Sequence, residues 1–175
     1  MQRLNATISA PILDAIHELI AWEALSSKQV AEAVGQLSSF FTIERRALNQ
    51  KYMEDRLLRA GYLQYFLPVN LAKIQLLLGE MPVLGVDSGF SVLDLGSGPG
   101  TGALAVLDWW HQQRSSHGLC VTAVDGSSEA LKQARQLWDR YCQAAGIGEA
   151  NLQTYEGELE RRIWLEQARQ RPSFD

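Results

Sequence analysis

A glycine-rich turn between an apolar strand and an amphipathic helix constrains the fold of this chain more than any other feature. Residues 91–102 read SVLDLGSGPGTG, so an apolar stretch ends in an acidic residue and glycines then alternate with other residues. Helical spacing of apolar residues begins directly after the turn, at Ala103. Strand, glycine turn and helix in this order form a ligand site at the carboxyl edge of a parallel sheet. Glycines suit such a turn because a ligand can approach the backbone without meeting a Cβ. The sequence therefore predicts an α/β fold with a cofactor site here.

The chain after residue 90 alternates strand and helix patterns. Apolar runs of strand length alternate with amphipathic stretches, which predicts strands at 90–95, 119–125 and 151–155 and helices at 100–114, 128–144 and 158–170. This βαβαβα order implies a parallel sheet with right-handed crossovers. We expect the first half of a Rossmann-like domain over residues 86–175, truncated before the fourth strand.

The first 85 residues carry helical patterns only and are predicted to form a separate helical region. Apolar residues recur there at helical spacing in four stretches. We expect a helix that begins near Pro11, a second capped by Ser26 or Ser27, a third from Ile43 to Ala60 that stops at Gly61, and a fourth that begins near Pro68 or Asn70.

A glycine-rich turn of this kind occurs in three classes of ligand site. A phosphate-binding P-loop requires a lysine after its last glycine, and none follows here. A dinucleotide site requires GxGxxG, whereas the third glycine here falls one position early, at Gly100. A nicotinamide-dependent oxidoreductase is therefore the less favoured alternative. The GxGxG form preceded by Asp94 resembles motif I of class I S-adenosylmethionine-dependent methyltransferases.

An acidic residue at the end of the second predicted strand supplies the other half of this signal. Asp125 closes the run VTAVD, and a carboxylate there can accept two hydrogen bonds from the hydroxyls of a ribose. The alternatives are that Asp94 only contacts the end of the following helix and that Asp125 only caps the next one.

The resemblance to class I methyltransferases implies a set of cofactor-binding residues. Asp94 is expected to contact the methionine amino group, directly or through water, and Asp125 the ribose. An acidic residue after the third strand would lie near the adenine. The set is Asp94, Gly96, Ser97, Gly98, Gly100, Asp125, Gly126 and Glu158, with Glu156 in reserve for the last place. In this class the catalytic base or substrate clamp comes from the loop after the fourth strand, so no catalytic residue is named.

A second segment narrows the resemblance. Residues 62–73 read YLQYFLPVNLAK and lie one predicted helix ahead of LDLGSGPGT. This combination is similar to the methyltransferase-like proteins associated with the mitochondrial small ribosomal subunit, and to their bacterial relatives. It implies a role in methylation of small-subunit ribosomal RNA or in ribosome assembly. The alternative is a catalytically inactive assembly or RNA-binding protein of the same fold. The iron–sulfur cysteines of the mitochondrial members have no counterpart here, because the chain has two cysteines and they lie far apart.

A group of basic and aromatic residues could contact RNA, independently of the family resemblance. Basic and aromatic side chains gather on the third predicted helix and just beyond it: Arg45, Arg46, Lys51, Arg56 and Arg59, with Tyr52, Tyr62 and Tyr65. Such a set can contact phosphates and stack on bases. The alternative is a solvated helix face with its aromatics in the core, because Glu44, Glu54 and Asp55 dilute the charge.

Composition adds only broad limits. The net charge is −4 and the sequence pI is about 5.4, so the chain has no global basic footprint for nucleic acid. Its three histidines and two cysteines form no metal-ligand spacing, so no metal is expected. No apolar run reaches the length of about 18 residues that a membrane helix needs. We expect a cytoplasmic protein, or a mitochondrial matrix protein if the source is eukaryotic.

Overall fold

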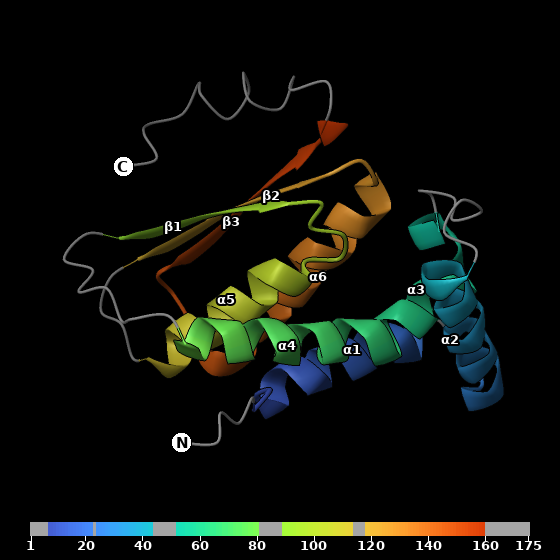
Figure 1. The fold of residues 1–175 in the computed structure, drawn as a ribbon. Helices are drawn as coiled ribbons and strands as arrows, with labels where there is room; N and C mark the ends of the chain where they lie inside the picture. The colour runs from blue at the N-terminus through green and yellow to red at the C-terminus, as the bar shows by residue number, and fades with distance from the viewer. Residues whose placement is uncertain (1–6, 23, 44–51, 81–88, 114–117, 160–175) are drawn as a thin grey trace.

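The protein combines a parallel sheet with a layer of helices, as the alternating pattern predicted. The structure, a computed structural model, describes residues 7–22, 24–43, 52–80, 89–113 and 118–159 (Figure 1). The N-terminal elements are α1 (Ala10–Trp22), α2 (Ser27–Thr42), the short 3-10 helix η1 (Tyr52–Glu54), α3 (Arg56–Gly61), the π-helical turn η2 (Tyr62–Phe66) and α4 (Leu67–Glu80). They are followed by β1 (Phe90–Leu95), α5 (Thr101–Gln112), β2 (Leu119–Asp125), α6 (Ser128–Ala145) and β3 (Ala150–Glu156).

The described strands form one parallel sheet in the order β1-β2-β3. Leu95, Val124 and Tyr155 lie in register across it, so the carboxyl ends of the strands meet at one edge. The α/β class and the predicted strands are thereby confirmed, with β3 one residue longer at each end than expected. The predicted helix at 158–170, the expected end of the domain and the boundary near residue 85 fall largely or wholly outside the described residues.

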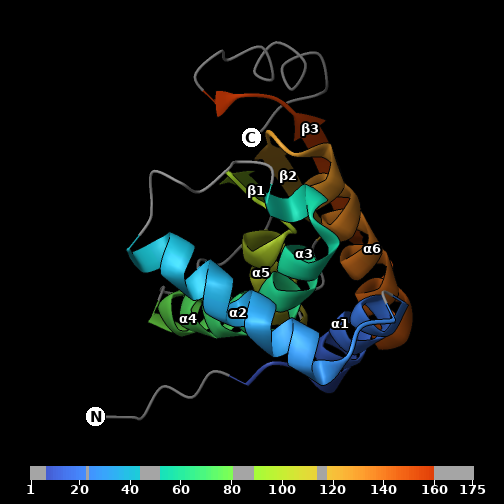
Figure 2. The ribbon, with the colours of Figure 1, turned by 90° about the vertical axis from the view of Figure 1, so that its right-hand side faces the viewer.

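The described helices lie on one face of the sheet (Figures 1 and 2). Helices α5 and α6 contact the strands, while α4 packs on α5 and α1 packs on α6. One apolar core joins these layers, and its members include Ile12, Ile16, Leu67, Leu71, Leu104, Leu107, Val121 and Leu137. Burial of this shared surface is the main driving force for docking the N-terminal helices onto the sheet layer.

A buried carboxylate on α5 also ties the helices together. Asp108, which has no exposed surface, accepts hydrogen bonds from Gln75 Nε2 of α4 at 2.5 Å and from the Tyr141 hydroxyl of α6 at 2.6 Å. The Ser9 backbone N–H, just before α1, donates to the same carboxylate at 3.3 Å. We call Asp108, Gln75, Tyr141 and Ser9 the Asp108 cluster; it links four helices through one buried group.

The expected third helix differs from what the structure shows. Its first half, residues 44–51, lies outside the described residues, and Tyr52–Glu54 form the 3-10 helix η1 instead of an α-helix. Asp55 then starts α3, because its Oδ1 accepts the backbone N–H groups of Leu57 at 2.8 Å and Leu58 at 3.0 Å. An aspartate side chain that caps the first turn favours a helix start over a continuing helix.

The predicted helix stop at Gly61 is wrong. Gly61 has helical backbone angles, φ −60° and ψ −41°, and the chain continues through η2 into α4. The reason for the widened turn lies ahead of it: Pro68 has no N–H, and in a regular α-helix its ring would clash with the carbonyl four residues earlier. In η2 the Leu67 N–H reaches back five residues to the Tyr62 carbonyl, which lets the helix pass the proline without ending.

Helix α2 begins as predicted. Ser26 is its N-cap and forms a capping box with Gln29, whose backbone N–H donates to Ser26 Oγ at 3.3 Å. The Ser26 backbone N–H in turn donates to Gln29 Oε1 at 3.0 Å. This reciprocal pair fixes the start of the helix that packs against α3.

Candidate functional site

The turn between β1 and α5 has the left-handed geometry that its glycines allow. Gly96, Gly98 and Gly100 have φ values of 72°, 53° and 84°. The N–H groups of Gly96 and Ser97 donate to the carbonyl of Val124 at 2.8 and 3.1 Å, which fastens the turn to the end of β2. Residues other than glycine rarely adopt such angles, so the sequence of the turn follows from its shape.

The glycines of the turn serve two different purposes. A Cβ on Gly96 or Gly98 would meet no atom within 4 Å, so both face open space. A Cβ on Gly100 would lie 2.8 Å from the Ala134 Cβ of α6, and one on Gly102 would lie 2.6 Å from Asp94 Oδ2. Gly96 and Gly98 therefore leave room for a ligand, whereas Gly100 and Gly102 allow close packing within the protein.

Asp94 lies at the end of β1 and contacts the start of α5. Its Oδ2 accepts the Ala103 N–H at 3.0 Å, so the interpretation as a helix-end partner holds for one of its two oxygens. Burial raises the pKa of Asp94; the Ala103 hydrogen bond opposes the shift, and the negative charge of Asp125 adds to it. The charge of Asp125 thus disfavours a second charge on Asp94 at this edge of the sheet.

Asp125 bridges the glycine turn and the loop that leads into α6. Its Oδ2 accepts the Gly98 N–H at 2.8 Å and its Oδ1 accepts the Ser127 N–H at 2.9 Å. The interpretation of Asp125 as only a helix cap is wrong, because Ser127 is the N-cap of α6 and its Oγ accepts the Ala130 N–H. An ionised carboxylate has about four lone-pair sites, so Asp125 is oriented by two bonds and can still accept a ligand's hydroxyls.

Two buried hydroxyl groups at the turn lack partners. Ser97 and Thr101 are 5% and 6% exposed, and neither Ser97 Oγ nor Thr101 Oγ1 forms a hydrogen bond in the described part of the chain. Buried polar groups are usually satisfied, and leaving one unpaired costs about 1–3 kcal/mol. A polar ligand at the turn would relieve that cost, so these residues fit a cofactor with hydrogen-bonding groups.

The remaining predicted site residues lie around the same edge. Glu156 is in register with Asp125, and the Gly157 N–H donates to the Asp125 carbonyl at 3.0 Å. Gly126 and Glu158, the residues that follow Asp125 and Gly157, are exposed. The structure therefore brings the ends of β1, β2 and β3 together, as expected for residues at the carboxyl ends of parallel strands.

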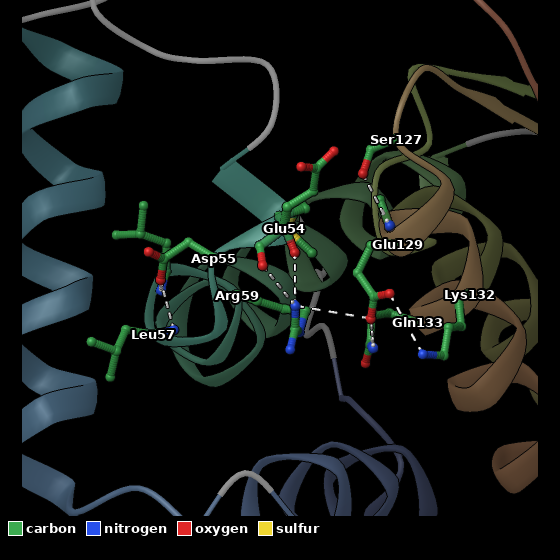
Figure 3. A network of polar contacts seen from close by, with 11 residues as sticks. Glu54, Asp55, Leu57, Arg59, Ser127, Glu129, Lys132 and Gln133 are labelled. Atoms are coloured by element: carbon green, nitrogen blue, oxygen red, sulfur yellow. Dashed lines mark hydrogen bonds and ion pairs between the residues drawn. The ribbon is translucent and has the colours of Figure 1, made fainter.

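Sequence reasoning missed a polar network beside this edge (Figure 3). Arg59 of α3 is only 9% exposed, and its Nη1 donates to the Met53 carbonyl at 2.9 Å. The same nitrogen lies 3.9 Å from Glu129 Oε1 in the first turn of α6. Gln133 donates to Glu129 Oε1, and Lys132 lies 3.5 Å from Glu129 Oε2. No local pattern signals this contact, because α3 and α6 lie far apart in the sequence.

Some of the basic and aromatic residues that could contact RNA belong to this network or pack near it. Arg59 is buried in the network, and Tyr52 and Tyr62 pack edge-on against Phe41 at ring distances of 5.8 and 6.4 Å. These three side chains therefore have partners within the protein. Arg56 and Tyr65 are exposed, while Arg45, Arg46 and Lys51 lie outside the described residues.

The described residues contain no group of three or more His, Cys, Asp or Glu side chains placed to bind a metal ion. None of the helices described has the length and apolarity needed to cross a membrane.

Comparison with known proteins found similarity to a solved structure. No protein-family model matches the chain, and no curated protein matches it. Among solved structures the chain is similar to YjhP from E. coli, a structural-genomics target, with 25% sequence identity and a TM-score of 0.30. The match covers 50% of this chain and 29% of the YjhP chain. This chain therefore spans under a third of the structure that it matches.

Proposed function

We propose that this chain binds S-adenosylmethionine and forms the cofactor-binding part of a methyltransferase. The observation that carries the proposal is the arrangement at the sheet edge. Gly96 and Gly98 face open space in left-handed conformations, and the Asp125 carboxylate is held beside them by two backbone N–H groups. A GxGxG turn followed by an acidic residue at the end of the next strand suits an adenosine ligand with an amino-acid tail.

Each residue of this edge has a distinct part in binding. Asp125 accepts hydrogen bonds from the ribose hydroxyls, and the open sides of Gly96 and Gly98 admit the ligand to the backbone. Asp94 supplies negative charge for the ligand's amino group, and Ser97 supplies a hydroxyl with no protein partner in the described residues. S-adenosylmethionine brings an electrophilic methyl group on a sulfonium centre, so the protein mainly has to position the reactants.

We further propose small-subunit ribosomal RNA, or ribosome assembly, as the setting of this activity. The support is the resemblance of residues 62–73 to the ribosome-associated methyltransferase-like proteins, together with the exposed Arg56 and Tyr65 beside that segment. The alternative is a catalytically inactive assembly protein that keeps the cofactor fold. Transfer of labelled methyl groups to small-subunit ribosomal RNA distinguishes the two.

The first experiment is a calorimetric titration with S-adenosylhomocysteine, with NAD run in parallel. We expect saturable binding of S-adenosylhomocysteine alone. Asp125→Ala removes two possible charge-assisted bonds to the ribose and should weaken binding by about 1.5–3 kcal/mol, roughly 10- to 150-fold in Kd. Asp139→Ala removes an exposed carboxylate farther along α6 and serves as the control.

Two results would contradict the proposal. If Asp125→Ala binds S-adenosylhomocysteine as tightly as the wild type does, Asp125 does not bind the ribose. If the protein binds NAD in preference to S-adenosylhomocysteine, the glycine turn belongs to a dinucleotide-binding site.

A further inference from the structure

The N-terminal helical region contacts α6, the helix that follows the Asp125 loop, through the short helix η1. Tyr52–Glu54 contact α6, the helix whose first turn follows the Asp125 loop. Met53 is buried at 2% exposure, so η1 is anchored in the protein and is not a surface excursion. An element from the N-terminal region therefore packs on the helix that follows the Asp125 loop.

Arg59 fixes the position of η1. Its guanidinium donates to the Met53 carbonyl at 2.9 Å and to the Glu54 carbonyl at 3.5 Å, and it lies 3.9 Å from Glu129 Oε1 (Figure 3). Glu129 is itself oriented by Gln133 of the same helix. A buried arginine with several donors in a rigid fork can thus connect the backbone of η1 to α6.

Tyr52 of η1 is held in one orientation. Its ring packs edge-on against Phe41 at 5.8 Å and lies 5.9 Å from the ring of Tyr62. Burial raises the pKa of the Tyr52 hydroxyl, and the charges of Tyr62 and Asp125 raise it further. Tyr52 lies in the element that Arg59 joins to Glu129 in the first turn of α6, and its hydroxyl forms no hydrogen bond within the described residues.

We propose that Tyr52 is a ligand-binding residue of the Asp125 edge and that Arg59, paired with Glu129, is the positioning residue that keeps it there. The inference rests on the proposed function, because it assigns Tyr52 to the same adenosine ligand. A phenol both donates and accepts hydrogen bonds. The Tyr52 hydroxyl can therefore donate to a ribose hydroxyl that itself donates to Asp125. The helical region thereby becomes part of the cofactor site.

The first test removes only the hydroxyl. Tyr52→Phe keeps the ring contacts with Phe41 and Tyr62, so the unfolding midpoint should stay unchanged. The Kd for S-adenosylhomocysteine should rise by about 2- to 12-fold, the range that corresponds to one neutral hydrogen bond. Tyr65→Phe is the matched control because Tyr65 is 51% exposed, and its Kd should equal that of the wild type.

The second test separates positioning from general stability. Glu129→Gln removes the charge that faces Arg59, and Arg59→Lys keeps the charge but not the fork that binds two carbonyls. Both should weaken binding in the wild-type background. In the Tyr52→Phe background Glu129→Gln should add little, because the two changes act through one contact. Glu18→Gln is the control: it disrupts the Glu18–Arg140 pair, 3.4 Å long, which joins α1 to α6 elsewhere.

The outcomes distinguish the inference from the function on which it rests. If the wild type does not bind S-adenosylhomocysteine, the proposed function and the inference both fail. If the wild type binds, Asp125→Ala weakens binding and Tyr52→Phe does not, the inference fails and the function stands. If Tyr52→Phe weakens binding but Glu129→Gln has its full effect in both backgrounds, the positioning role of Arg59 is overturned.

Discussion

Asp94 illustrates at the residue scale how a residue proposed to bind a ligand can work against stability. Its carboxylate is partly buried, and burial is the main reason that its pKa is raised in the folded protein. A raised pKa in an acid means that the folded state favours the proton more than the unfolded state does. The contribution of Asp94 to stability is therefore largest below its unfolded pKa and is lost as the pH rises through its folded pKa.

This sign gives a prediction for Asp94→Asn. The amide keeps an oxygen that can accept the Ala103 N–H but carries no charge to desolvate. The free energy of unfolding of the variant should rise relative to the wild type between pH 4 and neutrality, as measured by urea unfolding across that range. The Kd for S-adenosylhomocysteine at neutral pH should increase about tenfold or more, because a charge-assisted contact to the ligand's amino group is lost.

The two readouts for Asp94 move in opposite directions, which is characteristic of a functional group held at some cost to stability. A variant that loses stability at neutral pH would show that the Ala103 contact outweighs the burial of the charge. If the Asp94→Asn variant binds S-adenosylhomocysteine as tightly as the wild type does, Asp94 is not a ligand-binding residue.

The glycines of the turn make a second prediction at this scale. Gly96→Ala forces a Cβ into the left-handed region, which costs about 1–2 kcal/mol, but the methyl group meets no protein atom. Gly100→Ala has the same strain and also places its Cβ 2.8 Å from the Ala134 Cβ. Thermal unfolding should therefore show the larger loss for Gly100→Ala. Gly96→Ala should weaken S-adenosylhomocysteine binding, because its methyl group occupies space that the ligand needs. Equal losses of stability in the two variants would contradict the different roles given to Gly96 and Gly100.

Much of the candidate site could be predicted from the sequence because its residues follow strand ends. Asp94, the glycines and Asp125 occupy positions that the chain order alone brings to one edge of a parallel sheet. Tyr52, Arg59 and Glu129 could not be predicted in this way. Their contact depends on how the N-terminal helices dock on α6, and no local spacing encodes that arrangement.

At the scale of the elements, Gly61 shows where a correct residue-type rule gave the wrong structure. A glycine after an amphipathic stretch is typical of a helix end, yet Gly61 lies inside a continuous helical segment. A Cβ there would lie 3.0 Å from both the Ala33 Cβ and the Val34 backbone nitrogen of α2. The glycine is needed because two helices approach closely, and only the packed structure shows the second helix.

Gly61 and Gly35 form a matched pair for a test of this explanation. Both are helical, but a Cβ on Gly35 would meet nothing within 4 Å. Gly35→Ala should stabilise the protein by about 0.5–1 kcal/mol, since alanine loses less conformational entropy than glycine in a helix. Gly61→Ala should destabilise it, because α2 must move away from α3. Urea unfolding of the two variants measures both signs, and a stabilising Gly61→Ala would show that the helices have room to separate.

At the scale of the whole molecule, the N-terminal helices and the sheet share one core. The sequence predicts a helical region followed by a sheet domain, because the spacing of apolar residues changes from helical only to alternating strand and helix. The apolar cluster that includes Ile12, Leu67, Leu104 and Val121 extends across both parts. Periodicity identifies which face of a helix is apolar but not which partner covers it, so this continuity could not be predicted.

The Asp108 cluster provides the last prediction, which concerns cooperativity. Tyr141 is 1% exposed, and its hydroxyl donates to Asp108 Oδ1 at 2.6 Å. Tyr141→Phe keeps the ring in the core and removes a hydrogen bond to a buried carboxylate, which should lower the free energy of unfolding by about 1.5–3 kcal/mol. Because the cluster and the core join α1, α4, α5 and α6, amide hydrogen exchange should accelerate by the same factor in α1 and in β2. Tyr65→Phe, at an exposed position, should change neither. Faster exchange in α1 with unchanged protection in β2 would instead show that the helical region opens independently of the sheet. In that case Arg59 would hold η1 against α6 without support from a common core.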